Sequence, residues 1–66
     1  MSNKQRVFEF LKNYVNENGY PPTYREIGEG LEMHLSTVSH WLDKLEIEGK
    51  IERSKPKSAR AIRIVG

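Results

Sequence analysis

Small polar side chains gather in one short stretch of the sequence, at Ser36, Thr37, Ser39 and His40. Hydroxyl and imidazole groups donate and accept hydrogen bonds, and on a helix they are small enough to reach base edges in the major groove of DNA. The same residue types also occur on ordinary solvated helix faces, so this stretch alone does not separate the two interpretations. The segment that follows it favours contact with DNA.

That segment is basic. From residue 53 to residue 63 the chain carries five basic side chains and no acidic one, namely Arg53, Lys55, Lys57, Arg60 and Arg63. The net charge of the whole chain is only +2, but residues 33–66 carry seven basic and four acidic residues. Such clustering is typical of a surface that binds a polyanion, although a solvated basic tail would have the same composition.

Catalytic and metal-binding chemistry has little support in the sequence. Without cysteine, the chain can form neither a disulfide nor a thiolate zinc site. His34 and His40 are not accompanied by a third ligand, which disfavours a metal site. Ser39 and His40 are adjacent, and adjacent residues on a helix do not face one another. We therefore expect a protein that is not an enzyme, with no cofactor, no metal and no small-molecule ligand.

The chain also lacks the features of a membrane or secreted protein. No stretch approaches the roughly 20 apolar residues that a membrane span needs, and the first ten residues lack the apolar run of a secretory signal. We expect a soluble, cytoplasmic protein without a membrane partner. Its 66 residues are enough for a single domain, 1–66, with a modest core.

Two helices are predicted in the first half of the chain. Apolar residues recur at three- and four-residue spacing from Val7 to Val15, which predicts a helix from Asn3 to Glu17 or Asn18, ended by Gly19. After two prolines, the pattern Thr23-x-x-Glu26 is that of a capping box and predicts a short second helix, with Ile27 and Leu31 on its buried face.

A third helix and a hairpin are predicted in the second half. Residues 32–35 form a connection, and the helix opens at Leu35 or Ser36 and ends before Gly49, with Ser36, His40, Asp43 and Ile47 opposite its apolar face. Short extended runs then begin at Ile51 and at Ile62, on either side of a basic loop. A further short strand after the first helix is left open. The predicted core is Val7, Leu11, Tyr14, Ile27, Leu31, Val38, Leu42, Leu45, Ile51, Ile62 and Ile64.

This order of elements predicts a mainly α-helical winged helix-turn-helix fold, with three helices and a two-stranded antiparallel wing. In such a fold the third helix enters the major groove and the basic wing contacts phosphates. The start of the second helix can also donate to the backbone through Thr23, Tyr24 and Arg25. We place Lys44 and Arg53 among the phosphate contacts as well. Trp41 is predicted to pack in the core rather than to stack on a base.

Three segments resemble the DNA-binding domain of LexA-type repressors. They are residues 19–29 (GYPPTYREIGE), Ser36-Thr37-Val38 followed by Leu42-x-x-Leu45-Glu46-x-x-Gly49-x-Ile51, and residues 59–64 (ARAIRI). The resemblance covers nearly the whole chain. It implies a bacterial or phage-encoded repressor of DNA-damage (SOS) genes that binds a palindromic operator as a homodimer. It also implies base contacts from His34, Ser36, Thr37, Ser39 and His40, and backbone contacts from Lys55, Lys57 and Arg60.

The sequence departs from this family in two places. The turn between Leu31 and Ser36 is one residue shorter than in close family members, which bears on the operator sequence. The peptidase domain that carries the family's dimerisation surface and its Ser/Lys catalytic pair has no counterpart in the 66 residues. We therefore expect neither self-cleavage nor a response to damage by that route, and both an excised domain and a complete small protein fit the sequence.

The main alternative is a winged-helix module that docks on a protein and regulates a repressor or a polymerase. That function would predict an apolar patch on the outward face of the third helix. This face is polar apart from Ile47 and Leu35, although Asp43 and Glu46 oppose phosphate. DNA binding is the better interpretation, and we expect two copies on adjacent half-sites, about 10–10.5 bp apart.

Overall fold

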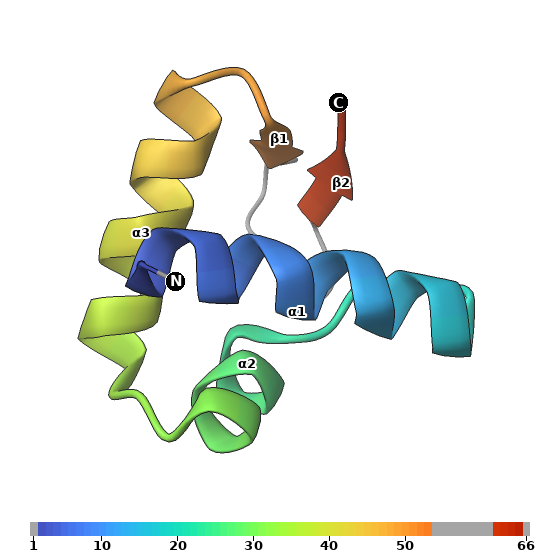
Figure 1. Ribbon diagram of the computed structural model, residues 1–66, viewed down its shortest axis with the longest axis horizontal. Coiled ribbons are helices and arrows are strands. Elements are labelled where there is room, and N and C mark those ends of the chain that lie inside the picture. Colours follow the sequence, from blue (N-terminus) through green and yellow to red (C-terminus); the bar gives the residue numbers. More distant parts are fainter. Residues whose placement is uncertain (1, 54–61, 66) are drawn as a thin grey trace.

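The computed structural model describes residues 2–53 and 62–65. These residues form three helices, α1 (Asn3–Asn18), α2 (Tyr24–Leu31) and α3 (Leu35–Ile47), and two strands, β1 (Ile51–Arg53) and β2 (Ile62–Ile64). The strands pair antiparallel near one end of the molecule, α2 lies at the other end, and α1 packs against both α2 and α3 (Figure 1). The winged helix-turn-helix predicted from the sequence is confirmed.

Both ends of α1 are capped, and the cap at Gly19 was predicted from the sequence. The hydroxyl of Ser2 accepts a hydrogen bond from the backbone N–H of Gln5 at 3.1 Å. At the other end, Gly19 adopts the left-handed conformation (φ 80°), and its N–H donates to the carbonyl of Val15 at 2.8 Å. Glycine adopts this conformation without a steric penalty, which is why the helix ends there.

The start of α2 is fixed by the predicted capping box. Thr23 Oγ1 accepts from the backbone N–H of Glu26 at 3.0 Å, and Glu26 Oε1 accepts from the N–H of Thr23 at 2.7 Å. The hydroxyl of Tyr14 donates to Glu26 Oε2 at 3.0 Å. One carboxylate therefore caps α2 and also joins it to α1.

Residues 32–34 form the turn between α2 and α3. Glu32 adopts the left-handed conformation (φ 56°, ψ 49°), and the N–H groups of Glu32 and Met33 both donate to the carbonyl of Gly28. A Cβ atom at Gly28 would lie 2.7 Å from the carbonyl oxygen of Met33. The turn can fold back this closely on α2 only because Gly28 has no side chain.

The core contains residues from all three helices and both strands. Its eight members are each at most 4% exposed: Val7, Leu11, Ile27, Val38, Leu42, Leu45, Ile51 and Ile62. Three predicted core residues, Tyr14, Leu31 and Ile64, are only half-buried. Leu31 and Ile64 pack against the edge of the core, and Tyr14 keeps its hydroxyl on the Glu26 carboxylate. Pro22, which was not predicted for the core, is fully buried.

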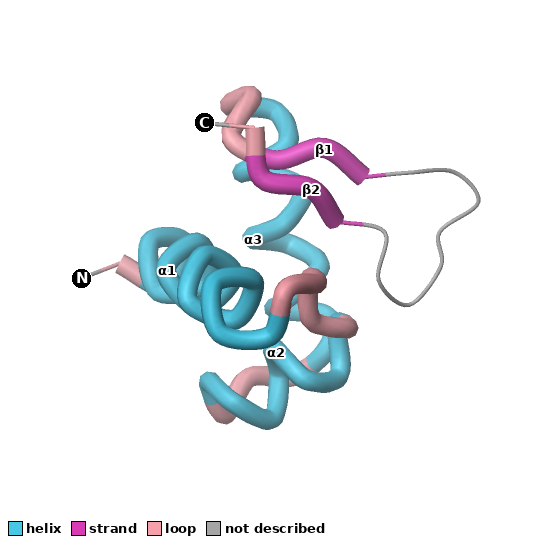
Figure 2. The backbone as a smooth tube through the Cα atoms, turned by 90° about the vertical axis from the view of Figure 1, so that its right-hand side faces the viewer, coloured by secondary structure: helices cyan, strands magenta, loops and turns pink. Residues whose placement is uncertain are grey.

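The two strands lie side by side (Figure 2), and their register and burial give the hairpin an inner and an outer face. Ile51 pairs with Ile64, Glu52 with Arg63, and Arg53 with Ile62. Because side chains alternate along a strand, Arg53 shares the inner face with Ile51, while Glu52 forms an ion pair with Arg63 on the outer face. Residues 20–23, where a third strand was left open, are irregular, and the described sheet has two strands.

Candidate nucleic-acid interface

The five side chains predicted to read bases lie together at the start of α3. His34 is the N-cap residue of α3 and makes no side-chain capping hydrogen bond. His34, Ser36 and His40 are exposed, and Thr37 and Ser39 are half-buried. At about 100° per residue, Ser36 and His40 point away from the buried side of the helix, with Thr37 and Ser39 on its two flanks. The structure thus assembles a small, polar, hydrogen-bonding surface at this end of α3.

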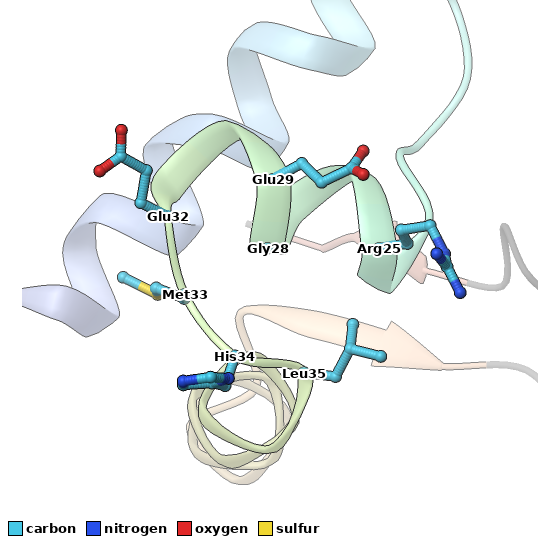
Figure 3. A pocket seen from close by; sticks show the side chains of 7 residues that line it. All are labelled: Arg25, Gly28, Glu29, Glu32, Met33, His34 and Leu35. Atoms are coloured by element: carbon cyan, nitrogen blue, oxygen red, sulfur yellow. The ribbon is translucent and has the colours of Figure 1, made fainter.

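A hollow of about 400 Å³ lies beside this surface, where the turn meets α2. It is lined by Arg25, Gly28, Glu29, Glu32, Met33, His34 and Leu35, and Figure 3 shows Arg25 and Leu35 pointing to one side of it and His34 to the other. Leu35 is 51% exposed. From the sequence, Leu35 was predicted to lie at the start of the helix and was weighed only as an apolar residue of the docking alternative. Its exposure could have been inferred from the sequence, because Leu35 is the first residue of a helix whose next turn carries the polar residues Ser36, Thr37, Ser39 and His40.

The residues predicted to contact phosphate from α2 differ in how accessible their polar groups are. Thr23 is half-buried and its hydroxyl accepts the capping hydrogen bond from Glu26. The hydroxyl of Tyr24 accepts a hydrogen bond from Arg53 at 2.9 Å. Arg25 is exposed in the first turn of α2. Of the three, Arg25 presents the most accessible donor.

The guanidinium of Arg53 is engaged by other side chains of the fold. Its side chain is 8% exposed and points to α3, where Nη2 donates to Asp43 and, at 2.6 Å, to Glu46. The guanidinium also reaches Tyr24. The contact with the DNA backbone predicted for Arg53 would have to replace these hydrogen bonds, because strand alternation puts the residue on the inner face with Ile51. That alternation could have been read from the sequence.

This cluster of Arg53, Asp43, Glu46 and Tyr24 joins β1 to α3 and α2. The hydrogen bond from Arg53 lowers the pKa of Glu46 below its ordinary value, and the hydrogen bond to Glu46 is the largest cause of a raised pKa for Arg53. Both shifts favour the charged forms. The base of the wing is therefore held on α3 by charge-assisted hydrogen bonds.

Of the four remaining residues predicted to contact phosphate, one lies in the part of the chain that the structure describes. Lys44 is exposed in the last turn of α3. Lys55, Lys57 and Arg60 lie outside the described residues.

The helix-turn-helix geometry and the polar start of α3 agree with a comparison against protein families. The model of the LexA DNA-binding domain matches residues 1–61. The chain belongs to this family.

Individual LexA repressors are also similar to the chain. Those of Carboxydothermus hydrogenoformans and of an Exiguobacterium species are each 44% identical to it over 63 residues, and that of an Arthrobacter species is 40% identical. These matches cover 94% of the chain but only 25–30% of each repressor. The chain thus corresponds to about a third or less of the length of these relatives.

Other kinds of site find little support in this LexA-family domain. Among residues 2–53 and 62–65, no three His, Cys, Asp or Glu residues are grouped as a metal site would need. In the same part of the chain, no helix is both long and apolar enough to cross a membrane. Trp41 is half-buried and packs against the core, as predicted.

The surface of α3 in this LexA-family domain also bears on the protein-docking alternative. Its two exposed large apolar residues are Leu35 and Ile47, which are 51% and 80% exposed. They lie at opposite ends of the helix, about 18 Å apart along its axis at 1.5 Å per residue. Two apolar residues so far apart do not form the continuous patch that a docking face would need.

Proposed function

We propose that the chain binds double-stranded DNA in a sequence-specific manner and represses transcription, with α3 in the major groove. The observation that carries the proposal is the polar, hydrogen-bonding surface at the start of α3, immediately after a helix-turn-helix turn, in a chain of the LexA DNA-binding domain family. Such side chains can pair with base edges, where sequence is read.

Base reading is assigned to His34, Ser36, Thr37, Ser39 and His40. Ser36 and His40 face outward and can reach the floor of the groove, while the half-buried Thr37 and Ser39 can contact bases at its sides. Phosphate contacts are assigned to Arg25 and Lys44, whose side chains are exposed, and to Thr23, Tyr24, Lys55, Lys57 and Arg60. Arg53 is left out of this set because Asp43 and Glu46 already engage it.

Leu35 is added to the base-reading residues. An exposed apolar side chain at the tip of a recognition helix suits contact with the methyl group of thymine. Replacing single thymines of the operator by uracil removes only that methyl group. At one position we expect this to weaken binding of the wild type but not of Leu35→Ala, measured by competition. Equal losses for both proteins at every position would exclude the contact.

The binding unit is proposed to be two copies on a palindromic operator. One domain of this size offers few base contacts, and pairs of such domains bind half-sites whose centres lie about one helical turn apart. The dimer is proposed to form on DNA.

The proposed function is tested by selecting duplexes from a random library with the wild-type domain. We expect enrichment of an inverted repeat and, by analytical ultracentrifugation, two copies on each selected duplex. Enrichment of a single half-site with one copy bound would remove the palindrome and the dimer from the proposal. If no sequence were enriched, sequence-specific binding itself would be refuted.

A further inference from the structure

The outward side of α3 changes character along its length. Its first half presents serine, threonine and histidine. Its second half presents Asp43 and Glu46, whose side chains are 55% and 41% exposed, beside the exposed Lys44 and Ile47. If α3 lies in a groove lined by phosphates, two carboxylates near its outward side oppose binding. For α3 to approach the phosphates, a positively charged group must offset the charge of these carboxylates.

Arg53 supplies that compensation from a different element. Its Nη2 bonds to Asp43 and, at 2.6 Å, to Glu46, and its Nε also donates to Glu46 at 3.2 Å. A third partner, the Tyr24 hydroxyl, accepts from Nη1 at 2.9 Å. The guanidinium is thereby held at a fixed position between the two carboxylates.

The strand register determines the side of the hairpin to which the side chain of Arg53 points. It lies opposite Ile62, which is 4% exposed, and on the same side of the hairpin as Ile51. Only 8% of its side chain is exposed. Turning the guanidinium toward a phosphate would give up its hydrogen bonds to Asp43, Glu46 and Tyr24.

We propose that Arg53 is a positioning residue for DNA binding that acts through Asp43 and Glu46, by neutralising their charge so that α3 can approach the phosphates. The inference rests on the proposed function. Lysine cannot replace it fully, because a single ammonium group lacks the planar set of donors that reaches three partners from one position.

The test is a rescue experiment read as affinity for the selected duplex. Arg53→Met keeps an apolar stem and removes the charge, and we expect it to weaken binding about five- to tenfold through carboxylate–phosphate repulsion. Adding Asp43→Asn and Glu46→Gln to Arg53→Met should restore affinity to within about threefold of the wild type, since the repelling charges are then absent. Arg53→Met should therefore weaken binding less in the Asp43→Asn/Glu46→Gln background than in the wild type. A direct phosphate contact by Arg53 predicts the same loss in both backgrounds, and that result would overturn the inference.

Two further proteins make the result decisive. Lys12→Met removes one positive charge from α1, where Lys12 pairs with Glu9, and serves as the control for net charge, with little change in affinity expected. Asp43→Asn/Glu46→Gln with Arg53 retained should bind more tightly than the wild type, because Arg53 is then an uncompensated cation. This variant keeps the test valid if Arg53→Met does not fold, and unchanged or weaker binding by it would contradict the inference.

The outcomes also separate this inference from the proposed function. A wild-type domain that binds no duplex refutes both. A wild-type domain that binds, together with the same loss from Arg53→Met in both backgrounds, refutes only the role of Arg53.

Discussion

At the scale of single residues, Glu32 carries an unusual backbone conformation. Among the described residues other than glycine, it is the one with a positive φ, at 56°. The left-handed conformation costs an L-residue roughly 1–2 kcal/mol. A glycine at this position would avoid that cost, but its greater conformational freedom in the unfolded chain would offset part of the gain. The turn therefore stores strain at the junction between the two helices that the proposed interface depends on.

Glu32→Gly should raise the free energy of unfolding by about 0.5–1 kcal/mol, since glycine adopts this conformation without the Cβ penalty. Urea denaturation of the two proteins measures the difference. Glu29→Gly is the matched control, because Glu29 is an exposed residue inside α2, where glycine costs about 1 kcal/mol. Equal losses of stability in both variants would show that Glu32 is not strained.

Glu46 makes a second residue-scale prediction, on pH. The Arg53 guanidinium holds the pKa of Glu46 below its ordinary value of 4.5. A carboxyl group with a lower pKa in the folded chain stabilises the fold above its unfolded pKa, and this stabilisation is lost as the pH falls through the folded pKa. The wild type should therefore be more stable than Glu46→Gln near neutral pH, and the difference should shrink as the pH falls below 4.5. Denaturation curves that stay equally far apart at acid pH would contradict the ion pair.

At the scale of elements, the junction of α2 and α3 depends on glycine. A Cβ at Gly28 would meet the backbone oxygen of Met33 at 2.7 Å, whereas one at Gly30 would meet the ring of Phe10 at 2.3 Å. A backbone oxygen held in a turn cannot move without opening the turn, but the ring of a half-buried side chain on α1 can swing away. An added Cβ should therefore disrupt the fold more at Gly28 than at Gly30, although the contact distances are similar.

Gly28→Ala should lower the free energy of unfolding by about 1–3 kcal/mol, as overpacking does in well-packed sites. It should also weaken DNA binding more than the loss of stability explains, because the turn sets the angle of α3. Gly30→Ala should cost less, because alanine favours a helix by about 1 kcal/mol over glycine. Thermal unfolding and anisotropy on the same samples test both statements, which would be refuted if Gly30→Ala were the more damaging change.

Most elements could be predicted because their signals are local. Apolar spacing, the capping box from Thr23 to Glu26 and the terminal Gly19 give the helices nearly to the residue. The errors arise where a contact joins distant parts of the chain. Tyr14 was assigned to the core because its spacing fits, but its hydroxyl bonds to Glu26 on another helix.

The same distinction applies to the candidate site. The polar start of α3 could be found from sequence, since spacing on one helix determines which residues point outward. Arg53 was assigned to phosphate because it belongs to a run of basic residues, and composition says nothing of its partners. Its pairing with Asp43 and Glu46 depends on how β1 packs on α3. Strand alternation from Ile51 predicts that Arg53 lies on the inner face but not which side chains it contacts there.

At the scale of the whole molecule, the charge of the proposed interface is local rather than overall. The net charge is only +2, and long-range attraction to DNA is correspondingly modest. Specificity must then come from short-range contacts of α3, and the acidic second half of that helix must be compensated within the fold. The chain also matches less than a third of the length of its relatives, so the proposed function is that of this domain on DNA.

The central claim is that α3 reads DNA sequence through its first turns. The most direct test is fluorescence anisotropy of the wild type and of Ser39→Ala/His40→Ala, each on the selected duplex and on a scrambled one. We expect the wild type to prefer the selected duplex, and the double variant to lose about 1–3 kcal/mol on that duplex for each contact removed, while binding to the scrambled duplex is almost unchanged. If the double variant kept the full preference of the wild type, the assignment of base reading to this face of α3 would be wrong.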